Sequence, residues 1–149
     1  MGVLNRFKIS DDFYLNEFES PDTHEVMVDP ELVHELQLLR DLLLEPLVVD
    51  SGYRTPEHNK AVGGVAGSFH RKGQAVDVST AALELRTLAK AAVEAGFRTV
   101  IAYQEKNFVH CALGPKDQII VPRDWIPLMR AFFPEKAELV YAFEDVFPV

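Results

Sequence analysis

The sequence predicts an α+β domain in which an antiparallel sheet of about four strands carries helices on one face and a functional site on the other. Apolar residues recur at helical spacing over 30–44 and 80–95, which predicts two amphipathic helices. Short β-branched runs lie between and after these helices, as is typical of strands. Two of the runs, 99–103 and 108–113, are separated by four residues, a spacing that predicts an antiparallel hairpin.

Length and composition fit one domain, 1–149, with a core over about 10–114 and a tail, 115–149, to which the pattern assigns no role. The chain has 149 residues, of which 48% are hydrophobic, and this suffices for a packed core. No run of 18 apolar residues is present, so we expect no membrane span. The net charge of −8 argues against a nucleic-acid partner, because phosphate binding requires clustered Lys and Arg.

The N-terminal sequence and the cysteine content indicate in which cellular compartment the protein is expected. The stretch from Met1 to Asp12 contains neither the apolar segment nor the small-residue cleavage site of a secretory signal. Cys111 is the only cysteine, so no intrachain disulfide can form and an oxidising compartment is not implied. We therefore expect no signal peptide and a protein that is cytoplasmic as made, unless it is released by other means or associated with a phage.

In the first half of the chain, Pro and Gly residues separate the expected elements. The aromatic-rich stretch 7–19 is expected to dock its rings on the core. A helix over 30–44 begins with Asp29 as its N-cap and a proline in its first turn. A short strand over 47–50 follows, and after a turn the residues 56–62 form a short helical piece.

In the second half, alternation over 75–79 predicts a strand whose two valines face the core. The helix over 80–95 is expected to begin with Thr80 as its cap and to end at Gly96. The hairpin follows this helix. Beyond residue 114 the pattern also allows short strands over 119–121 and 137–143 and a helix over 125–133.

Three polar residues are expected on the side of the sheet that faces away from the core. Asp77 is out of phase with the valines of its strand, and His110 is out of phase with Cys111, which we interpret as a small buried hydrophobe. His70 follows a Gly-rich loop, a common setting for site residues. Two imidazoles and one carboxylate form a ligand set that catalytic zinc uses, with a fourth position left for water. The alternative is that these are three unrelated polar residues.

The stretch 47–77 resembles the M15 peptidases, which are D-Ala-D-Ala carboxypeptidases and L-Ala-D-Glu endopeptidases, many of them encoded by phages. The chain matches the motif Ser-x-His-x-x-Gly-x-Ala-x-Asp at every fixed position, with Ser68, His70, Gly73, Ala75 and Asp77. Phe108-Val-His110 resembles a later element of the family, and Phe13-x-x-x-Glu17-Phe18 resembles its N-terminal stretch. The resemblance covers about 10–114 and implies a hedgehog/DD-peptidase-like fold.

This resemblance implies a zinc-dependent peptidase that hydrolyses peptidoglycan stem peptides, either as a D,D-carboxypeptidase or as an endopeptidase. His70, Asp77 and His110 would bind the zinc ion. Arg54 would bind a carboxylate or carbonyl group of the substrate, because a guanidinium group matches a planar oxyanion; the alternative is a surface ion pair. Ser68 would line the cleft and hydrogen-bond the substrate; the alternative is a hydroxyl that stabilises its own loop.

The general base is where the chain departs from the family pattern. Peptide hydrolysis needs a carboxylate that takes a proton from water and passes it to the leaving amine. The family has an acid a few positions before the last histidine ligand or two positions after it, but Asn107 and Ala112 stand at those positions here. Glu105 is the acid of the hairpin loop, and it would act as the base if the loop folds back. The alternative is a solvated loop residue.

The hairpin 103–113 also resembles part of the hedgehog signalling domain, which has the same fold and keeps the zinc but acts as a ligand for other proteins. The alternative function is therefore a catalytically inactive, zinc-stabilised binding or structural domain. The sequence leaves open which bond is cut and which oligomer forms.

Overall fold

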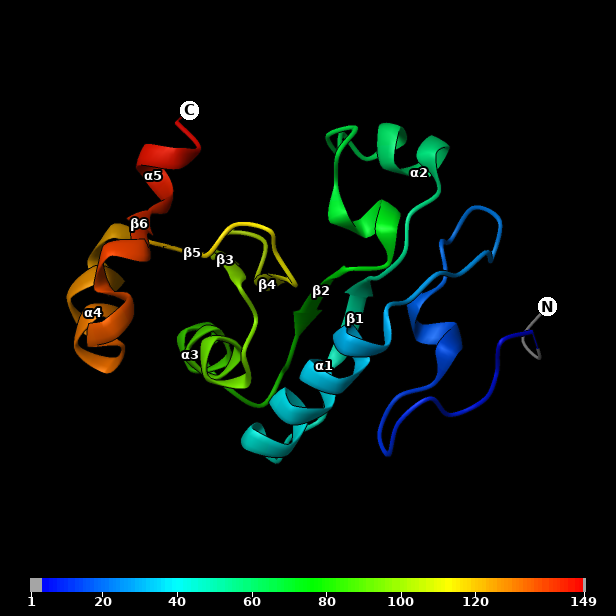
Figure 1. The fold of residues 1–149 in the computed structure, drawn as a ribbon, viewed down its shortest axis with the longest axis horizontal. Helices are drawn as coiled ribbons and strands as arrows, with labels where there is room; N and C mark the ends of the chain where they lie inside the picture. Colours follow the sequence, from blue (N-terminus) through cyan, green and yellow to red (C-terminus); the bar gives the residue numbers. More distant parts are fainter. Residues whose placement is uncertain (1–3, 149) are drawn as a thin grey trace.

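The computed structural model describes residues 4–148, and in it the protein is built on one six-stranded sheet. Residues 1–3, where the stretch examined for a secretory signal begins, and residue 149 lie outside this range. The strand order is β1-β2-β4-β3-β5-β6 (Figure 1). The strands are β1 (Val48–Ser51), β2 (Ala75–Ser79), β3 (Thr99–Tyr103), β4 (Phe108–Ala112), β5 (Gln118–Val121) and β6 (Val140–Ala142).

The predicted helices are confirmed to within a few residues at most of their ends. The structure contains α1 (Pro30–Leu43), α2 (Pro56–Ala61), α3 (Leu85–Ala95), α4 (Ile126–Phe132) and α5 (Phe143–Val146), with shorter 3-10 turns η1 (Leu15–Phe18), η2 (Phe69–Lys72), η3 (Arg123–Trp125) and η4 (Pro134–Leu139). The sequence did not predict α5: the strand expected over 137–143 is limited to Val140–Ala142, with η4 before it and α5 after it. Asp29 caps α1 by accepting the N–H of Glu31, as expected. The prediction that Thr80 caps the next helix is wrong, because its hydroxyl accepts a hydrogen bond from Ala82 and α3 begins only at Leu85. None of the helices described between residues 4 and 148 has the length and apolar character needed to cross a membrane.

The α+β class is confirmed, but the sheet is larger than predicted and is mixed rather than antiparallel. The four expected strands, β1, β2, β4 and β3, are joined by antiparallel pairs. β5 and β6 extend the sheet with parallel pairs, β5 on β3 and β6 on β5. A parallel pair requires the chain to cross over between its strands: β4 lies between β3 and β5 in the sequence, and α4 lies between β5 and β6. Strands of four and three residues are too short for alternation to predict such pairing.

One face of the sheet is apolar and is covered by α1, α3 and α4. In Figure 1, α1 and α3 lie together on the lower side of the sheet and α4 lies at its β6 end. Val76 and Val78 belong to this core, as alternation predicted, and Cys111 is fully buried among them as the expected small hydrophobe. The tail contributes to the same core through Met129 of α4.

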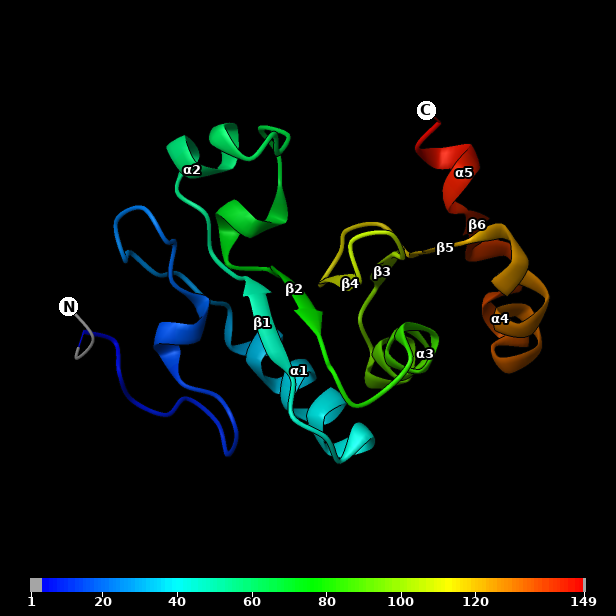
Figure 2. The same ribbon diagram turned by 180° about the vertical axis from the view of Figure 1, so that it is seen from behind.

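The opposite face of the sheet carries the polar residues that alternation placed there. Asp77 and His110 are paired directly across β2 and β4, and both are out of phase with the valines of the core. Seen from behind in Figure 2, α2 and α5 lie on the side of the sheet away from α1 and α3. The helices on the apolar face thus support the sheet, while short elements border the polar face.

The N-terminal aromatic stretch docks on the core, as predicted. Phe13 and Phe18 are buried, with ring centroids 6.1 Å apart in an edge-to-face arrangement. The backbone of Phe18 lies against Gly52, where a Cβ atom would come within 2.6 Å of Phe18 Cα. The Phe18 carbonyl also accepts the Tyr53 N–H at 2.7 Å. These contacts fix the backbone at Gly52, whose own carbonyl group reaches the polar face.

Gly73 ends η2 in the left-handed region, with φ 68°, and a Cβ atom there would lie 2.3 Å from the Met27 carbonyl oxygen. We expect Gly73→Ala to lower the free energy of unfolding by about 2–4 kcal/mol, because left-handed strain adds to a clash with backbone that cannot move freely. Urea unfolding measures this change. Gly67→Ala is the control, since nothing lies within 4 Å of a Cβ atom there; equal stability of the two variants would contradict the role given to Gly73.

Glu35 on α1 is a partly buried acid whose Oε2 has no hydrogen-bond partner among the described residues. Burial, reinforced by the negative charge of Glu31, raises the pKa of Glu35 from 4.5 to about 7. The folded state therefore binds this proton more tightly than the unfolded chain does. The resulting stabilisation is present at low pH and is lost as the pH rises from 4.5 through about 7.

We expect Glu35→Gln to raise the free energy of unfolding at about pH 8 by on the order of 1 kcal/mol, a value discounted for solvent screening. At about pH 4 the substitution should change stability little, because Glu35 is protonated in both states. Urea unfolding of both proteins at the two pH values provides the comparison. A difference between the proteins that does not vary with pH would count against the raised pKa.

Candidate metal centre

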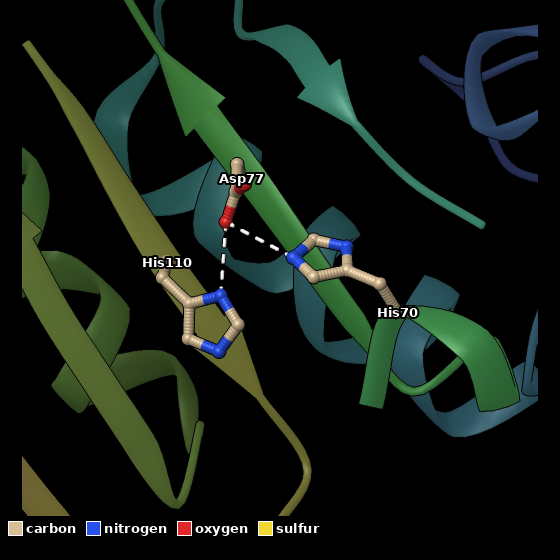
Figure 3. Close-up of side chains that lie close together, drawn as sticks. All are labelled: His70, Asp77 and His110. Atoms are coloured by element: carbon tan, nitrogen blue, oxygen red, sulfur yellow. Dashed lines mark hydrogen bonds and ion pairs between the residues drawn. The ribbon is translucent and has the colours of Figure 1, made fainter. Parts of the chain in front are cut away.

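Three elements bring His70, Asp77 and His110 together on the polar face of the sheet. Asp77 and His110 are cross-strand neighbours on β2 and β4, so their side chains leave the same face side by side. His70 comes from η2, whose first turn is capped by the Ser68 hydroxyl, which accepts the His70 N–H at 3.3 Å. One ligand atom from each residue lies within 4.8 Å of the other two, and Figure 3 shows the three side chains converging.

The carboxylate of Asp77 divides its two oxygens between different partners. Oδ1 lies 2.9 Å from His110 Nδ1 and 3.3 Å from His70 Nε2, whereas Oδ2 accepts a 3.3 Å hydrogen bond from Arg54 Nη2. Asp77 faces away from the apolar core but is only 6% exposed. Burial raises the pKa of Asp77, but the hydrogen bond from His110 and the closeness of both imidazole rings outweigh it and hold the pKa below the usual range. Asp77 is therefore ionised at neutral pH, the form that binds a cation.

The ring of His70 is oriented by a backbone carbonyl group. Nδ1 lies 2.8 Å from the carbonyl oxygen of Gly52, which can only accept, so Nδ1 carries the proton and Nε2 presents its lone pair. Nε2 is buried and has no hydrogen-bond partner among the described residues. Its contact with Asp77 Oδ1 joins two acceptors, an unfavourable arrangement without a cation between them.

The donor set fits a tetrahedral cation such as zinc. Zinc binds nitrogen and oxygen ligands at about 2.0–2.2 Å, so two ligands of a tetrahedron lie about 3.3–3.5 Å apart. The 3.3 Å separation between His70 Nε2 and Asp77 Oδ1 agrees with this value. The shorter contact between Asp77 and His110 is a hydrogen bond, and metal binding would displace its proton. Two imidazoles and one carboxylate therefore suit a catalytic rather than a purely structural zinc site.

The centre opens into a groove of about 560 Å³. The side chain of His110 is 18% exposed, against 2% for His70, so the open side of the centre lies towards His110. An aromatic wall borders the groove, because Tyr103 stacks on Phe108 at 4.7 Å and lies 6.1 Å from the ring of Phe147. The tail thus contributes a side chain to the groove.

Arg54 and Ser68 both line this groove, and each also has a partner within the protein. Besides Asp77, the Arg54 guanidinium donates to Ser51 Oγ at 3.1 Å and to Asn59 Oδ1 at 3.4 Å. This is a network beside the metal centre rather than the surface ion pair considered as an alternative. Ser68 stabilises its own turn through the cap on His70. The substrate-binding roles of Arg54 and Ser68 stay predictions.

Glu105 is not brought to the centre. It is exposed in the turn between β3 and β4 and lines a separate hollow of about 210 Å³ together with Phe143 and Glu144. The neighbouring Lys106 lines both this hollow and the groove. Among the described residues that line the groove, Asp77 is the only acid. The role of Glu105 as general base stays a prediction, and it requires the turn to move.

Several residues that shape the centre were not found from the sequence. Gly52 acts through its carbonyl group, which residue type does not reveal. Phe147 reaches the groove only because the tail folds back onto Tyr103. Lys106 and Lys116 also line the groove. The predicted hairpin loop contains Lys106 next to Glu105, so its place in that loop could have identified Lys106 as a candidate site residue.

Comparison with known proteins identifies the family. The family model described as Peptidase M15 matches residues 12–112. The chain belongs to the M15 peptidase family. The matched range includes the three residues of the metal centre and Arg54, and it ends before the strands β5 and β6 of the tail.

Similar proteins of this family include the peptidoglycan L,D-endopeptidase MepK of Escherichia coli (strain K12) and that of Shigella flexneri. Each is 35% identical to this M15 peptidase over 95 residues, which cover 59% of this chain and 52% of the relative. The chain spans about half the length of the curated relatives it matches.

We expect the purified protein to bind one zinc ion and to be stabilised by it. At a free zinc concentration about 100 times the Kd, the free energy of unfolding should rise by about 2.7 kcal/mol, which corresponds to an increase in Tm of about 5–10 °C. His70→Ala should abolish the increase, because it removes the unpartnered Nε2. His34→Ala, on the exposed side of α1, should keep it. Thermal unfolding and metal analysis provide the test, and an unchanged zinc response of the His70 variant would contradict this site.

Proposed function

We propose that this M15 peptidase is a zinc-dependent enzyme that hydrolyses peptide bonds in peptidoglycan stem peptides. The observation that carries the proposal is the buried Nε2 of His70, which has no hydrogen-bond partner in the part of the chain that the structure describes and lies 3.3 Å from Asp77 Oδ1 beside an open groove. Of the two activities left open by the sequence, endopeptidase is favoured. The similar proteins are named L,D-endopeptidases, and the groove continues along β4 on both sides of His110, as an uninterrupted substrate chain requires.

Each residue of the site has a distinct part in this proposal. His70, Asp77 and His110 would hold the zinc ion, which supplies the Lewis acidity that activates water and polarises the carbonyl group of the scissile bond. Arg54 holds Asp77 in position through Oδ2, and its guanidinium geometry suits a carboxylate or carbonyl group of the substrate. The Ser68 hydroxyl accepts the His70 N–H and can donate its own hydrogen to the substrate.

Proton transfer is assigned to Glu105. Its carboxylate would take a proton from the attacking water and give it to the leaving amine, which regenerates the carboxylate. Glu105 is adjacent to Lys106, which lines the groove, so a movement of the turn would carry the acid towards the scissile bond. Catalytic contacts are often formed only when the substrate is bound, and an exposed turn is the part of a hairpin that moves most readily.

The second candidate is a catalytically inactive, zinc-stabilised binding or structural domain. One observation favours it: Asp77 is the only acid among the described residues that line the groove, and it belongs to the ligand set. If Glu105 stays in its separate hollow, zinc would stabilise the fold without a group to transfer protons. The two candidates predict the same metal content and differ in turnover.

We expect the zinc-loaded protein to cleave purified cross-linked muropeptides at L,D-bonds and to stop doing so when a chelator removes the metal. Mass spectrometry of the products identifies the bond that is cut. His70→Ala should be inactive, and His34→Ala should cleave as the unmodified protein does. Zinc binding without cleavage of any muropeptide would favour the inactive domain.

We expect Glu105→Gln to reduce kcat by about a hundredfold or more while the zinc content stays the same, because the substitution removes the proton acceptor and leaves the ligands intact. Glu135→Gln removes an exposed acid of η4 and serves as the control, with kcat unchanged. Steady-state cleavage of a muropeptide at saturating concentration measures kcat. Full activity of the Glu105 variant would show that another group moves the proton.

A further inference from the structure

The groove beside the metal centre is positively charged although the chain as a whole is acidic. The net charge of the chain is −8, yet Arg54, Lys106 and Lys116 line the groove, and Asp77 is the only acid among the described residues that do so. Arg54 and Asp77 form an ion pair at 3.3 Å. The two lysines, together with the metal when it is bound, therefore set the sign of the potential along the groove.

Both lysines are available to a ligand. Each is exposed, and neither takes part in an ion pair within residues 4–148. Each has an acidic neighbour in the sequence, but Asp117, next to Lys116, is held by Arg98 at 2.7 Å. Glu105, next to Lys106, lines a hollow outside the groove that Lys106 also lines, but the two side chains form no ion pair within residues 4–148. Neither lysine is therefore paired with the acid next to it in the sequence.

The lysines lie towards opposite ends of the groove. Lys106 is in the turn just before Phe108, whereas Lys116 follows Ala112 at the other end of β4. A strand rises about 3.3 Å per residue, so the two ends of β4 are about 13 Å apart, and His110 is midway between them. An extended peptide has the same rise per residue. A peptide that lies along β4 would therefore meet one lysine on each side of the metal centre.

We propose that Lys106 and Lys116 form two carboxylate-binding subsites that flank the metal centre, and that the groove selects stem peptides with free carboxylates on both sides of the cleaved bond. This inference rests on the proposed function, because it places the peptide across the metal. Stem peptides contain dicarboxylic residues whose second carboxyl group occurs either as the free acid or as the amide. An ammonium group attracts the acid and not the amide, so amidation is the chemical feature that the groove distinguishes.

The test compares two synthetic, fluorescently labelled stem peptides of identical sequence, one with free carboxylates and one in which these groups are amidated. Fluorescence anisotropy gives the Kd of each peptide for the zinc-loaded protein and for the protein in chelator. We expect the amidated peptide to bind about tenfold more weakly in both states at low salt, because two exposed ion pairs are lost. The ratio of the two Kd values should decrease as the ionic strength rises, because salt screens the exposed ion pairs.

Substitutions assign the preference to the two lysines. Lys106→Gln and Lys116→Gln should each weaken binding of the acidic peptide about threefold to fivefold and leave binding of the amidated peptide unchanged. Lys106→Arg and Lys116→Arg should retain the preference, because they retain the charge. Lys8→Gln removes an exposed charge outside the groove and should change neither affinity.

Equal affinity of the unmodified protein for the two peptides would overturn the inference. An effect of Lys8→Gln as large as that of the groove variants would do the same, because it would indicate a general effect of net charge. Cleavage is scored separately. If the zinc-loaded protein cuts no cross-linked muropeptide, the proposed peptidase activity fails, whereas a binding preference that depends on Lys106 and Lys116 still supports the two subsites.

Discussion

The rest of the site depends on how the two oxygens of the buried Asp77 carboxylate are divided between Arg54 and the two histidines. A carboxylate removed from water is strongly destabilising unless it is paired and hydrogen-bonded. Here Arg54 satisfies Oδ2, which leaves Oδ1 directed at His70 and His110. The same ion pair that makes burial tolerable thus orients the oxygen that a metal would use. Nε2 of His70 has no hydrogen-bond partner within residues 4–148, and a cation would satisfy it.

The register of the sheet positions Asp77 and His110 relative to each other. The register of β2 on β4 places Asp77 opposite His110 and Val76 opposite Cys111. A slip of one residue would turn the polar pair into the core and the apolar pair towards the groove, so burial of one face fixes the geometry of the other. His70 is positioned less directly, through the carbonyl group of Gly52 and the close packing of Gly52 on Phe18.

Local sequence patterns predicted the elements whose formation depends on neighbouring residues, such as capped helices and alternating strands. The helix after Asp29 and the strand around Asp77 follow from a cap and from alternation. His70 and Asp77 were predicted as site residues from the motif over 68–77, and His110 from the later element Phe108-Val-His110. Long-range and short features were out of reach. The parallel pairing of β5 and β6 is set by a crossover, and the direction of Glu105 is set by an exposed turn. The charge of the groove depends on Lys106 and Lys116, which no periodicity connects.

Because β5 pairs with β3, the sheet extends beyond the stretch that matches the family model. The similarity to the family ends at residue 112, but β3, which lies within that range, is hydrogen-bonded along its far side to β5. A polypeptide cut after Ala112 would leave the backbone amides and carbonyls of β3 without their β5 partners, next to a bare apolar surface that α4 normally shields. Such an edge is a template for self-association with other chains. The stretch that matches the family model and the stretch that completes the sheet are therefore different parts of the same polypeptide.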